Sequence, residues 1–326
     1  MSELVTADLA RGLLPARPGD SYKGTFGHAL VIAGTPQYPG AAGLASAAAA
    51  RSGAGLVTLA SGRNTPPVGR IPEVIARPLP EAEWGALGEA AADEIRTIAG
   101  DYQVLLIGPG LGREAATRQF LERLLGIEPP RQRSQIGFRF GASAEKPADT
   151  SNPALPPLVI DADALTLLGM IEAEHNGETP HWWEHLGRER AILTPHPGEM
   201  RRLLGVDTLD TDLADVAAQA ARRWAQIVVL KGADTIIAAP DGRVFVNQGG
   251  NAALATGGTG DVLAGTITGL LAQGVAPLDA AVLGVFLHSA AGRIVRDEIG
   301  DMGALAGDLL PRLPIAARRL KAGEDV

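Results

Sequence analysis

The chain has 326 residues, 46% of them hydrophobic, and a formal net charge of −8 from 29 Lys and Arg against 37 Asp and Glu. This composition is typical of a soluble globular protein with a substantial core, and the acidic balance argues against a general nucleic-acid binder. Cysteine is absent, which excludes disulfides, thiolate metal sites and cysteine nucleophiles.

A signal peptide has a basic region followed by an apolar run, and the N-terminal residues show neither. No apolar stretch approaches the roughly 20 residues that a membrane span requires. We therefore expect a cytoplasmic protein that binds neither nucleic acid nor membrane. Residues 1–22 are polar and contain proline, which predicts a short helix followed by a loop.

Buried apolar runs alternate with helical patterns along most of the chain. Strands are expected at 29–33, 56–60, 103–108, 158–161, 191–194, 227–231, 235–239 and 244–246. Helices are expected at 41–52, 85–99, 114–125, 163–172, 198–204, 212–225, 262–273, 277–297 and 303–320. Continuous Val, Ile and Leu strands between helices predict an α/β fold, with a mostly parallel central sheet covered by helices on both faces. We interpret residues 1–326 as a single domain.

Three stretches interrupt this alternation. A proline-containing segment at 62–80 is expected to be irregular, and residues 127–157, rich in proline and without a sustained period, are interpreted as a surface insertion. A second insertion is expected at 172–189, where His181 and His185 have the i, i+4 spacing of a metal pair on a helix. Because no acidic third ligand completes a known motif, a solvated helix with two packing tryptophans is the preferred interpretation.

The most unusual stretch is glycine-rich and precedes an apolar helical pattern. Gly257, Gly258 and Gly260 lie where the helix should begin, and Asp261 follows them. A helix N-terminus offers unpaired N–H groups and a positive dipole end, which attract an anion. Asp261 is then either a helix cap, as Asp commonly is, or a base that deprotonates a nucleophile attacking a phosphoryl group held there.

Polar groups also follow the predicted strands, at the sheet edge where ligands bind in such folds. His196 is held between two prolines in Thr194-Pro-His-Pro-Gly-Glu199, and Glu199 either favours the helix start or holds water around Mg²⁺. Asp161 and Asp163 either cap the next helix or position magnesium waters or a sugar hydroxyl.

Three further loops carry weaker signals. Lys231 could contact a phosphate and Thr235 a nucleotide, although the same residues fit a tight turn. The segment 23–27 (Lys-Gly-Thr-Phe-Gly) is similar to a phosphate or lid loop. The segment 108–112 (Gly-Pro-Gly-Leu-Gly) is a turn that exposes backbone, but neither a Rossmann fingerprint nor a Walker A pattern occurs.

Taken in order, these pieces resemble the ADP/ATP-dependent NAD(P)H-hydrate dehydratases, a family of the ribokinase-like superfamily. The resemblance runs from about residue 23 to residue 317. It is carried by the segments 23–27, 38–42, 53–57, 108–112, 161–163, 194–199, 230–233 and 257–265. The Gly-Thr-Gly-Asp run resembles the superfamily signature, and Thr-Pro-His-Pro-Gly-Glu and Gly-Pro-Gly-Leu-Gly indicate this family.

The resemblance implies that the protein restores hydrated NADH and NADPH, taking the S-epimer back to NAD(P)H with ADP as phosphoryl donor, ATP also being possible. Asp261 would be the catalytic base. The implied anion hole is Gly258, Thr259 and Gly260. The implied nucleotide-binding residues are Lys231, Gly232, Ala233, Asp234, Thr235 and Gly260. The implied contacts to the hydrated dinucleotide are Ala41, Ala42, Gly110, Gly112, His196 and Asp261.

The same resemblance implies Mg²⁺ as cofactor, with Glu199 acting on it through water, and a homo-oligomer, in particular a homotetramer. The chain begins close to the dehydratase part, so a separate protein is expected to supply the companion epimerase. Thr166 departs from the family pattern, which often has Asn there. Two alternatives stay open: a ribokinase-like kinase of a small hydroxylated metabolite or vitamin, and a non-catalytic nucleotide sensor.

Overall fold

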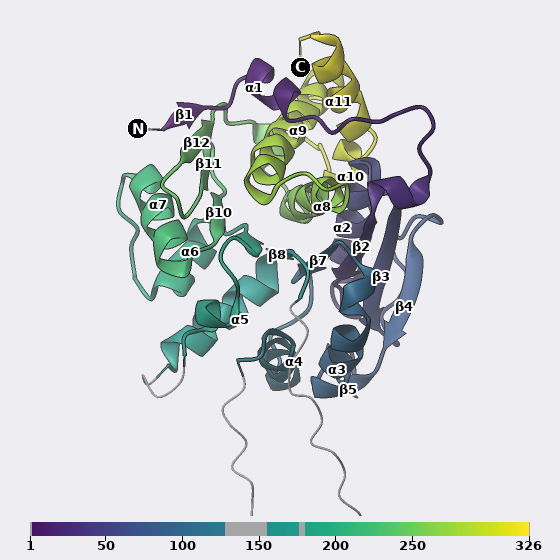
Figure 1. The fold of residues 1–326 in the computed structure, drawn as a ribbon, viewed down its shortest axis with the longest axis vertical. Coiled ribbons are helices and arrows are strands. Elements are labelled where there is room, and N and C mark those ends of the chain that lie inside the picture. The colour runs from purple at the N-terminus through teal and green to yellow at the C-terminus, as the bar shows by residue number, and fades with distance from the viewer. Residues whose placement is uncertain (1, 128–154, 176–179, 326) are drawn as a thin grey trace, which may run out of the picture.

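The computed structural model describes residues 2–127, 155–175 and 180–325 (Figure 1). The expected insertion at 127–157 therefore lies almost wholly outside the described residues. The main sheet has ten strands in the order β1-β12-β11-β10-β9-β8-β7-β2-β3-β4. Only β11 runs antiparallel to its neighbours β10 and β12, which confirms the mostly parallel sheet. The hairpin expected around Pro240 is the β11–β12 pair.

The strands of this sheet are β1 (Glu3–Leu4), β2 (His28–Ile32), β3 (Leu56–Gly62), β4 (Ile75–Leu79), β7 (Val104–Ile107), β8 (Leu158–Ile160), β9 (Ala191–Leu193), β10 (Ile227–Leu230), β11 (Thr235–Ala238) and β12 (Val244–Asn247). A separate small hairpin consists of β5 (Glu81–Glu83) and β6 (Ala86–Leu87). The helices are α1 (Ala7–Gly12), α2 (Pro39–Arg51), α3 (Glu89–Ile98), α4 (Ala115–Leu125), α5 (Ala162–Ala173), α6 (Pro197–Leu204), α7 (Leu213–Trp224), α8 (Thr259–Ala272), α9 (Pro277–Glu298), α10 (Ala306–Leu309) and α11 (Leu313–Ala322).

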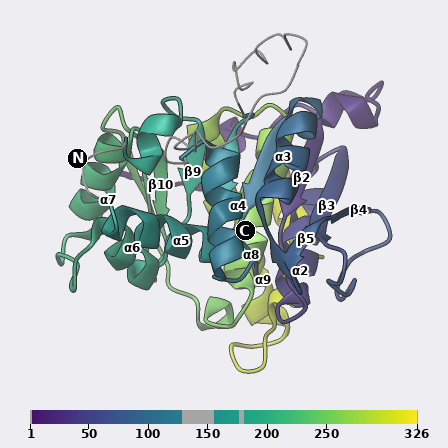
Figure 2. The ribbon, with the colours of Figure 1, turned by 90° about the horizontal axis from the view of Figure 1, so that it is seen from below.

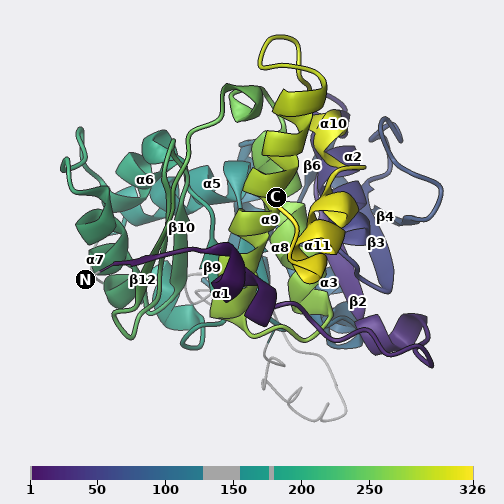
Figure 3. The same ribbon diagram turned by 90° about the horizontal axis from the view of Figure 1, so that it is seen from above.

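Helices cover both faces of the sheet, as expected. Helices α3 to α7 lie on one face (Figure 2), and α1, α2, α8, α9 and α11 lie on the other (Figure 3). Alternate residues of each strand point to opposite faces. On β2, for example, Leu30 and Ile32 belong to the core under the first group, whereas Ala29 and Val31 belong to the core under the second.

The alanine-rich helix α2 packs closely against α8. A Cβ added at Gly265 would lie 2.2 Å from the Ala45 carbonyl oxygen, and one at Gly269 would lie 2.4 Å from that of Ala49. Only glycine permits this approach of two backbones. The small residues of the sequence therefore bring the N-termini of α2 and α8 to the same end of the molecule.

Four expectations about elements are corrected. Residues 75–79 form the edge strand β4, where Pro78 is tolerated because an edge strand can leave an N–H side unpaired. Residues 3–4 pair with β12 as β1. The helix expected at 303–320 is two helices, because a new helix begins at Leu313, where the first turn accommodates Pro314 without its N–H. The helix expected at 85–99 begins only at Glu89, after the β5–β6 hairpin.

The stretch around His181 is also not the expected helix. In its described part, residues 182–185 form one 3-10 turn, with Trp182 and Trp183 buried as expected. The His181 ring stacks on Trp183 and its Nδ1 lies 2.9 Å from a Glu172 oxygen. No group of three metal-ligating side chains occurs among the described residues, so the metal pair is unsupported.

Helix α9 is long and apolar enough to cross a membrane by length and composition. Its most apolar 18-residue window, however, is 89% buried inside the structure, where the helix packs against one face of the sheet (Figure 3). This burial explains its composition as that of a core helix. It is the one such helix among the described residues.

Candidate active site

The first turn of α8 confirms the expected helix start at the glycine run. Gly258 is the N-cap, with φ +93° that suits glycine, and no side chain caps the helix there. A Cβ at Gly258 would lie 2.5 Å from Leu44 of α2 and 3.2 Å from Ala306 of α10. The N–H groups of Thr259 and Gly260 belong to the first turn, where no intrahelical acceptor exists. They are therefore suited to hold an anion.

Asp261 is the third residue of α8, so it is not the helix cap. Burial, together with the nearby Asp161 carboxylate, raises the pKa of Asp261 to about 7, although Lys231 opposes the shift. A carboxyl group with a pKa near neutrality can exchange a proton efficiently at physiological pH. Its environment therefore fits a base.

Lys231 is the cation of the site and lies at the end of β10. Its Nζ donates to Asp161 Oδ1 at 2.8 Å and lies 3.9 Å from Glu199 Oε2. Thr194 donates its hydroxyl to the same Asp161 oxygen at 2.7 Å. Burial would lower the pKa of Lys231, but the two carboxylates raise it above the ordinary value, so it stays charged. The ammonium also adjoins Gly260, where an added Cβ would lie 3.3 Å from it.

His196 and Glu199 cap α6, which supports the helix-start interpretation of this motif. His196 Nδ1 accepts from the backbone N–H groups of Gly198 and Glu199 at 2.9 and 3.3 Å. Glu199 Oε2 in turn accepts from the His196 N–H at 2.8 Å. Burial and nearby cations lower the pKa of His196, which favours the neutral ring. Because Nδ1 accepts, the hydrogen is on Nε2, which lies 3.5 Å from Glu199 Oε1, and the side chain is half exposed.

Glu199 has a second, electrostatic property. It is 6% exposed, and burial raises its pKa to about 7 despite Lys231 nearby. Asp261 and Glu199 therefore both titrate near neutrality, beside one ammonium group. Such pairs of perturbed carboxyls occur preferentially at functional sites.

The glycine turn after β7 lies against the start of α2. A Cβ at Gly110 would lie 3.1 Å from the Ala41 Cβ, so these two expected dinucleotide contacts are brought together. Asp163 accepts from Gly112 N at 3.0 Å and from Arg113 Nε at 2.7 Å. Asp163 thus fixes this turn and does not cap its helix. Ala42 is only 2% exposed, so in this structure it offers almost no surface to a ligand.

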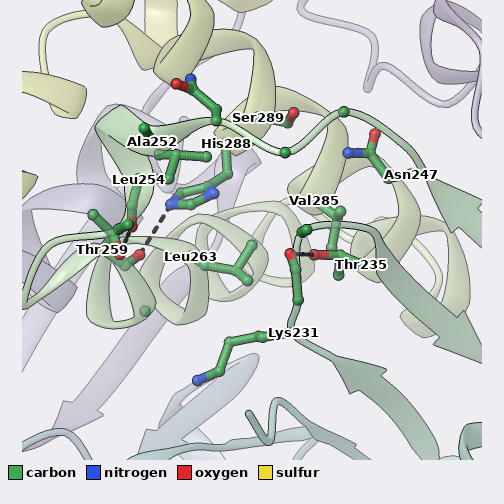
Figure 4. Close-up of a pocket in the computed structure, with 17 residues that line it drawn as sticks. Lys231, Thr235, Asn247, Ala252, Leu254, Thr259, Leu263, Val285, His288 and Ser289 are labelled. Carbon is green, nitrogen blue, oxygen red and sulfur yellow. Dashed lines mark hydrogen bonds between the residues drawn. The ribbon is translucent and has the colours of Figure 1, made fainter. Parts of the chain in front are cut away.

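A cavity of about 540 Å³ lies between the β10–β11 turn, α8 and α9 (Figure 4). Of the residues expected to bind the nucleotide, it is lined by Lys231, Gly232, Ala233, Thr235 and Gly260. Asp234 is not part of its wall and instead accepts from Gly249 N at 3.1 Å. Thr259 also lines the cavity, but its hydroxyl donates to the Leu254 and Thr256 carbonyls.

Sequence reasoning missed much of this cavity. Its remaining wall is Asn247, Gly249, Gly250, Asn251, Ala252, Leu254, Ala255, Leu263, Val285, His288 and Ser289. His288 and Ser289 are polar residues in the apolar middle of α9 (280–292), and this interruption is the signal that could have indicated them. Burial lowers the pKa of His288 to about 4, so the ring is neutral.

The segment 23–27 is not near this site. It precedes β2, and a Cβ at Gly27 would meet the Ala272 carbonyl oxygen at the last residue of α8. Helix α8 has 14 residues, about 20 Å at 1.5 Å per residue, and Asp261 lies at its other end. Within one copy of the chain, the expectation of a phosphate or lid loop at this site is therefore wrong, because the segment lies at the amino ends of the parallel strands, opposite to the site.

Comparisons with known proteins identify the family of this chain. The family model for NAD(P)H-hydrate dehydratase matches residues 29–130 and 143–314. The chain belongs to the NAD(P)H-hydrate dehydratase family.

Relatives of two lengths represent this dehydratase family. A bifunctional NAD(P)H-hydrate repair enzyme of Moorella thermoacetica is 38% identical over 98% of the chain, which spans 54% of that enzyme. The chain thus spans about half the length of these bifunctional relatives. An ADP-dependent (S)-NAD(P)H-hydrate dehydratase of Bacillus subtilis is 34% identical, over 94% of the chain and 96% of the relative.

The same dehydratase fold occurs in a solved structure. The ADP/ATP-dependent NAD(P)H-hydrate dehydratase of Bacillus subtilis, co-crystallised with ATP and Mg²⁺, superposes with a TM-score of 0.74 and 31% identity. The superposition covers 98% of this chain and 99% of that one. The expected ribokinase-like α/β fold is thereby confirmed.

Proposed function

We propose that this protein dehydrates the S-epimer of hydrated NADH and NADPH, using ADP as phosphoryl donor and releasing AMP and phosphate. The observation that carries the proposal is the position of Asp261. This near-neutral carboxyl lies on the first turn of α8, in the helix whose start also lines the nucleotide-sized cavity. The names of the relatives that the chain covers over most of their length, ADP-dependent (S)-NAD(P)H-hydrate dehydratases, supply the substrate class.

The proposed chemistry begins with proton removal. Asp261 takes the proton from the ring hydroxyl, whose oxygen forms a bond to the β-phosphorus of ADP while the bond to AMP breaks. The N–H groups of Gly258, Thr259 and Gly260 hold the moving phosphoryl group, and Lys231 balances its charge. The carbon–oxygen bond then breaks with phosphate as leaving group, and loss of a proton from the adjacent carbon restores the double bond. Phosphoryl transfer depends mainly on such positioning and charge stabilisation.

The donor chemistry of the site fits a magnesium ion held indirectly. No three described acids or histidines are grouped to ligate a metal, and Glu199 already accepts from its own helix cap. Mg²⁺ usually keeps several waters and binds substrate phosphates, so Glu199 would hold it through water. When bound, the ion would neutralise charge on the phosphates.

The contacts to the hydrated dinucleotide are part of the proposal. Ala41 and Gly110 adjoin each other, and Gly112 donates to Asp163, so packing and a hydrogen bond hold this surface in place. His196 presents its Nε2–H at the carboxyl end of β9. We assign it to the hydrated ring or its amide, in addition to its role in capping α6.

The decisive experiment incubates the protein with hydrated NADH, Mg²⁺ and either ADP or ATP, and follows the return of NADH absorbance. We expect recovery with ADP, and AMP and phosphate in amounts equal to the NADH formed. Absence of recovery with both nucleotides would refute the dehydratase. A stable phosphorylated product without NADH would instead support the ribokinase-like kinase, the second candidate. Nucleotide binding without any turnover would support the sensor.

The setting of the enzyme is also proposed. We infer a single-domain chain in the cytoplasm, assembled as a homotetramer and dependent on an epimerase activity for the R-epimer. The bifunctional names of the longer relatives support the link to a second repair activity. Light scattering of the purified chain tests the tetramer, since a monomer would contradict it.

A further inference from the structure

His288 is a buried polar residue for which the proposed chemistry has no role. It lies on α9, within the wall of the nucleotide cavity, and its Nε2 lies 2.9 Å from the Thr259 carbonyl oxygen (Figure 4). A carbonyl oxygen can only accept, so Nε2 must carry the hydrogen. Because burial keeps the ring neutral, Nδ1 carries none, and His288 brings no charge to a bound phosphate.

The carbonyl that His288 contacts belongs to a peptide unit whose N–H is part of the proposed anion hole. The Thr259 carbonyl and the Gly260 N–H are the two ends of one peptide unit, which is planar and trans. A bond that fixes the direction of the carbonyl therefore fixes the direction of the N–H. A hydrogen bond to the carbonyl also polarises the unit and strengthens its N–H as a donor.

The side chain of Thr259 is also fixed by hydrogen bonds. The Thr259 hydroxyl donates to the Leu254 carbonyl at 2.9 Å and to the Thr256 carbonyl at 3.1 Å. The side chain thus ties the helix start to the preceding loop, and His288 ties its main chain to α9. Gly260 has no side chain, so its peptide is held by the first turn of α8 and by these contacts.

We propose that His288 is a positioning residue that aims and polarises the Gly260 N–H toward the transferred phosphoryl group. The inference rests on the proposed function, because that function makes Gly260 part of the anion hole. His288 does not touch the reacting atoms and acts only through the Thr259–Gly260 peptide. It should therefore affect the transfer step more than nucleotide binding, which the rest of the cavity wall supplies.

The test compares His288→Leu, which cannot donate, with His288→Gln, whose amide can reach the carbonyl. Removing a direct anion-hole donor costs about 10²–10³ in kcat, so an indirect role predicts a loss of roughly tenfold for the leucine variant. The KM for ADP should stay within about threefold, and glutamine should restore most of kcat. Equal losses in both variants, or unchanged kcat in the leucine variant, would overturn the proposal.

A spectroscopic readout separates positioning from stability. In the ADP complex, the amide nitrogen signal of Gly260 should move upfield in His288→Leu and return in His288→Gln, because it senses hydrogen bonding at the preceding carbonyl. Val282→Ala, a buried change on α9 outside the cavity wall, should lower the melting temperature without moving this signal or kcat. If the leucine variant does not fold, His288→Asn, whose shorter amide does not reach, replaces it.

The outcomes distinguish the two proposals. Wild-type protein that fails to restore NADH refutes the proposed function, while the Gly260 signal still shows whether His288 orients that peptide. If the wild-type protein is active but the Gly260 amide signal does not move in His288→Leu, the role of His288 is refuted and the proposed function stands.

Discussion

Asp261 shows how position changes the meaning of a residue type. An aspartate in the first turn of a helix is usually stabilised as an anion by the helix dipole. Here burial and three other carboxylates outweigh that effect, and the pKa rises from 3.8 to about 7. The site therefore maintains a carboxyl that is ready to take a proton, at a cost in stability when it is ionised.

Asp261→Asn should abolish most turnover, because the amide cannot accept the hydroxyl proton. Loss of a positioned general base typically lowers the rate by about 10²–10⁴. Isothermal titration should show ADP binding close to that of the wild type, since Asp261 does not line the cavity. Turnover near the wild-type value would contradict the assigned role.

The pH dependence of kcat/KM should follow the same group. Because the ionised form is the base, activity should rise as the pH increases through about 7. Glu199 titrates near the same pH, so the wild-type profile reports both groups together. Glu199→Gln should leave a single transition that belongs to Asp261, and a profile flat between about pH 6 and 8 would be incompatible with this base.

The contribution of Asp261 to the free energy of unfolding should fall as the pH rises, whereas activity rises. Between the unfolded pKa of 3.8 and the folded pKa of about 7, the native state binds more protons than the unfolded state. The stabilisation that comes from protonated Asp261 is therefore fully present below the unfolded pKa and is lost as the pH rises through the folded pKa. Relative to wild type, Asp261→Asn should gain about 1–3 kcal/mol in unfolding free energy on going from about pH 5 to 8. Urea denaturation at the two pH values measures this difference.

The Asp161–Lys231 pair is the structural centre of the site's charges. Asp161 is 1% exposed, and its removal as Asp161→Asn would leave the ammonium without its main partner. Breaking a buried pair from one side costs about 3–5 kcal/mol. We expect chemical denaturation to show a loss of this order, and the double variant with Lys231→Met to lose less than the sum of the two single changes. Additive losses would mean that the pair is not coupled.

At the scale of elements, the α2–α8 contact determines where the helix N-termini lie. Gly265→Ala introduces a Cβ that overlaps the Ala45 carbonyl, so the helices must separate. Overpacking of this kind costs about 1–3 kcal/mol, and kcat should fall with it because the start of α8 moves. Gly12→Ala is the matched control, since its added Cβ meets nothing within 4 Å. Thermal unfolding that ranks the two variants equally would refute the close-packing argument.

At the scale of the whole molecule, ligand binding is coupled to folding. A nucleotide that binds only the folded protein stabilises it by about 2.7 kcal/mol at 100 times its Kd. We therefore expect ADP and ATP to raise the melting temperature in Asp261→Asn as in the wild type, and much less in Lys231→Met. Calorimetry that shows no nucleotide effect would exclude the 540 Å³ cavity as the donor site.

Local patterns in the sequence determined the order of elements and the position of the glycine-rich helix start. Apolar runs and helical periods are properties of neighbouring residues, so the eight strands that they predicted are all present. The sequence-based expectations were wrong where a segment's structure or position depends on residues far away in the chain. Strand β4 exists because β3 offers a free edge, and the segment 23–27 is placed by the far end of α8.

The tertiary structure alone decided how these pieces act together. Asp161 and Lys231 are 70 residues apart, and His288 meets Thr259 across 29 residues and two helices. No periodicity encodes such pairs, because they depend on how the sheet and helices pack. The near-neutral pKa of Asp261 has the same origin, since burial and distant carboxylates produce it. The sequence by itself thus determined a carboxyl at a helix start, and only the folded surroundings made it a candidate base.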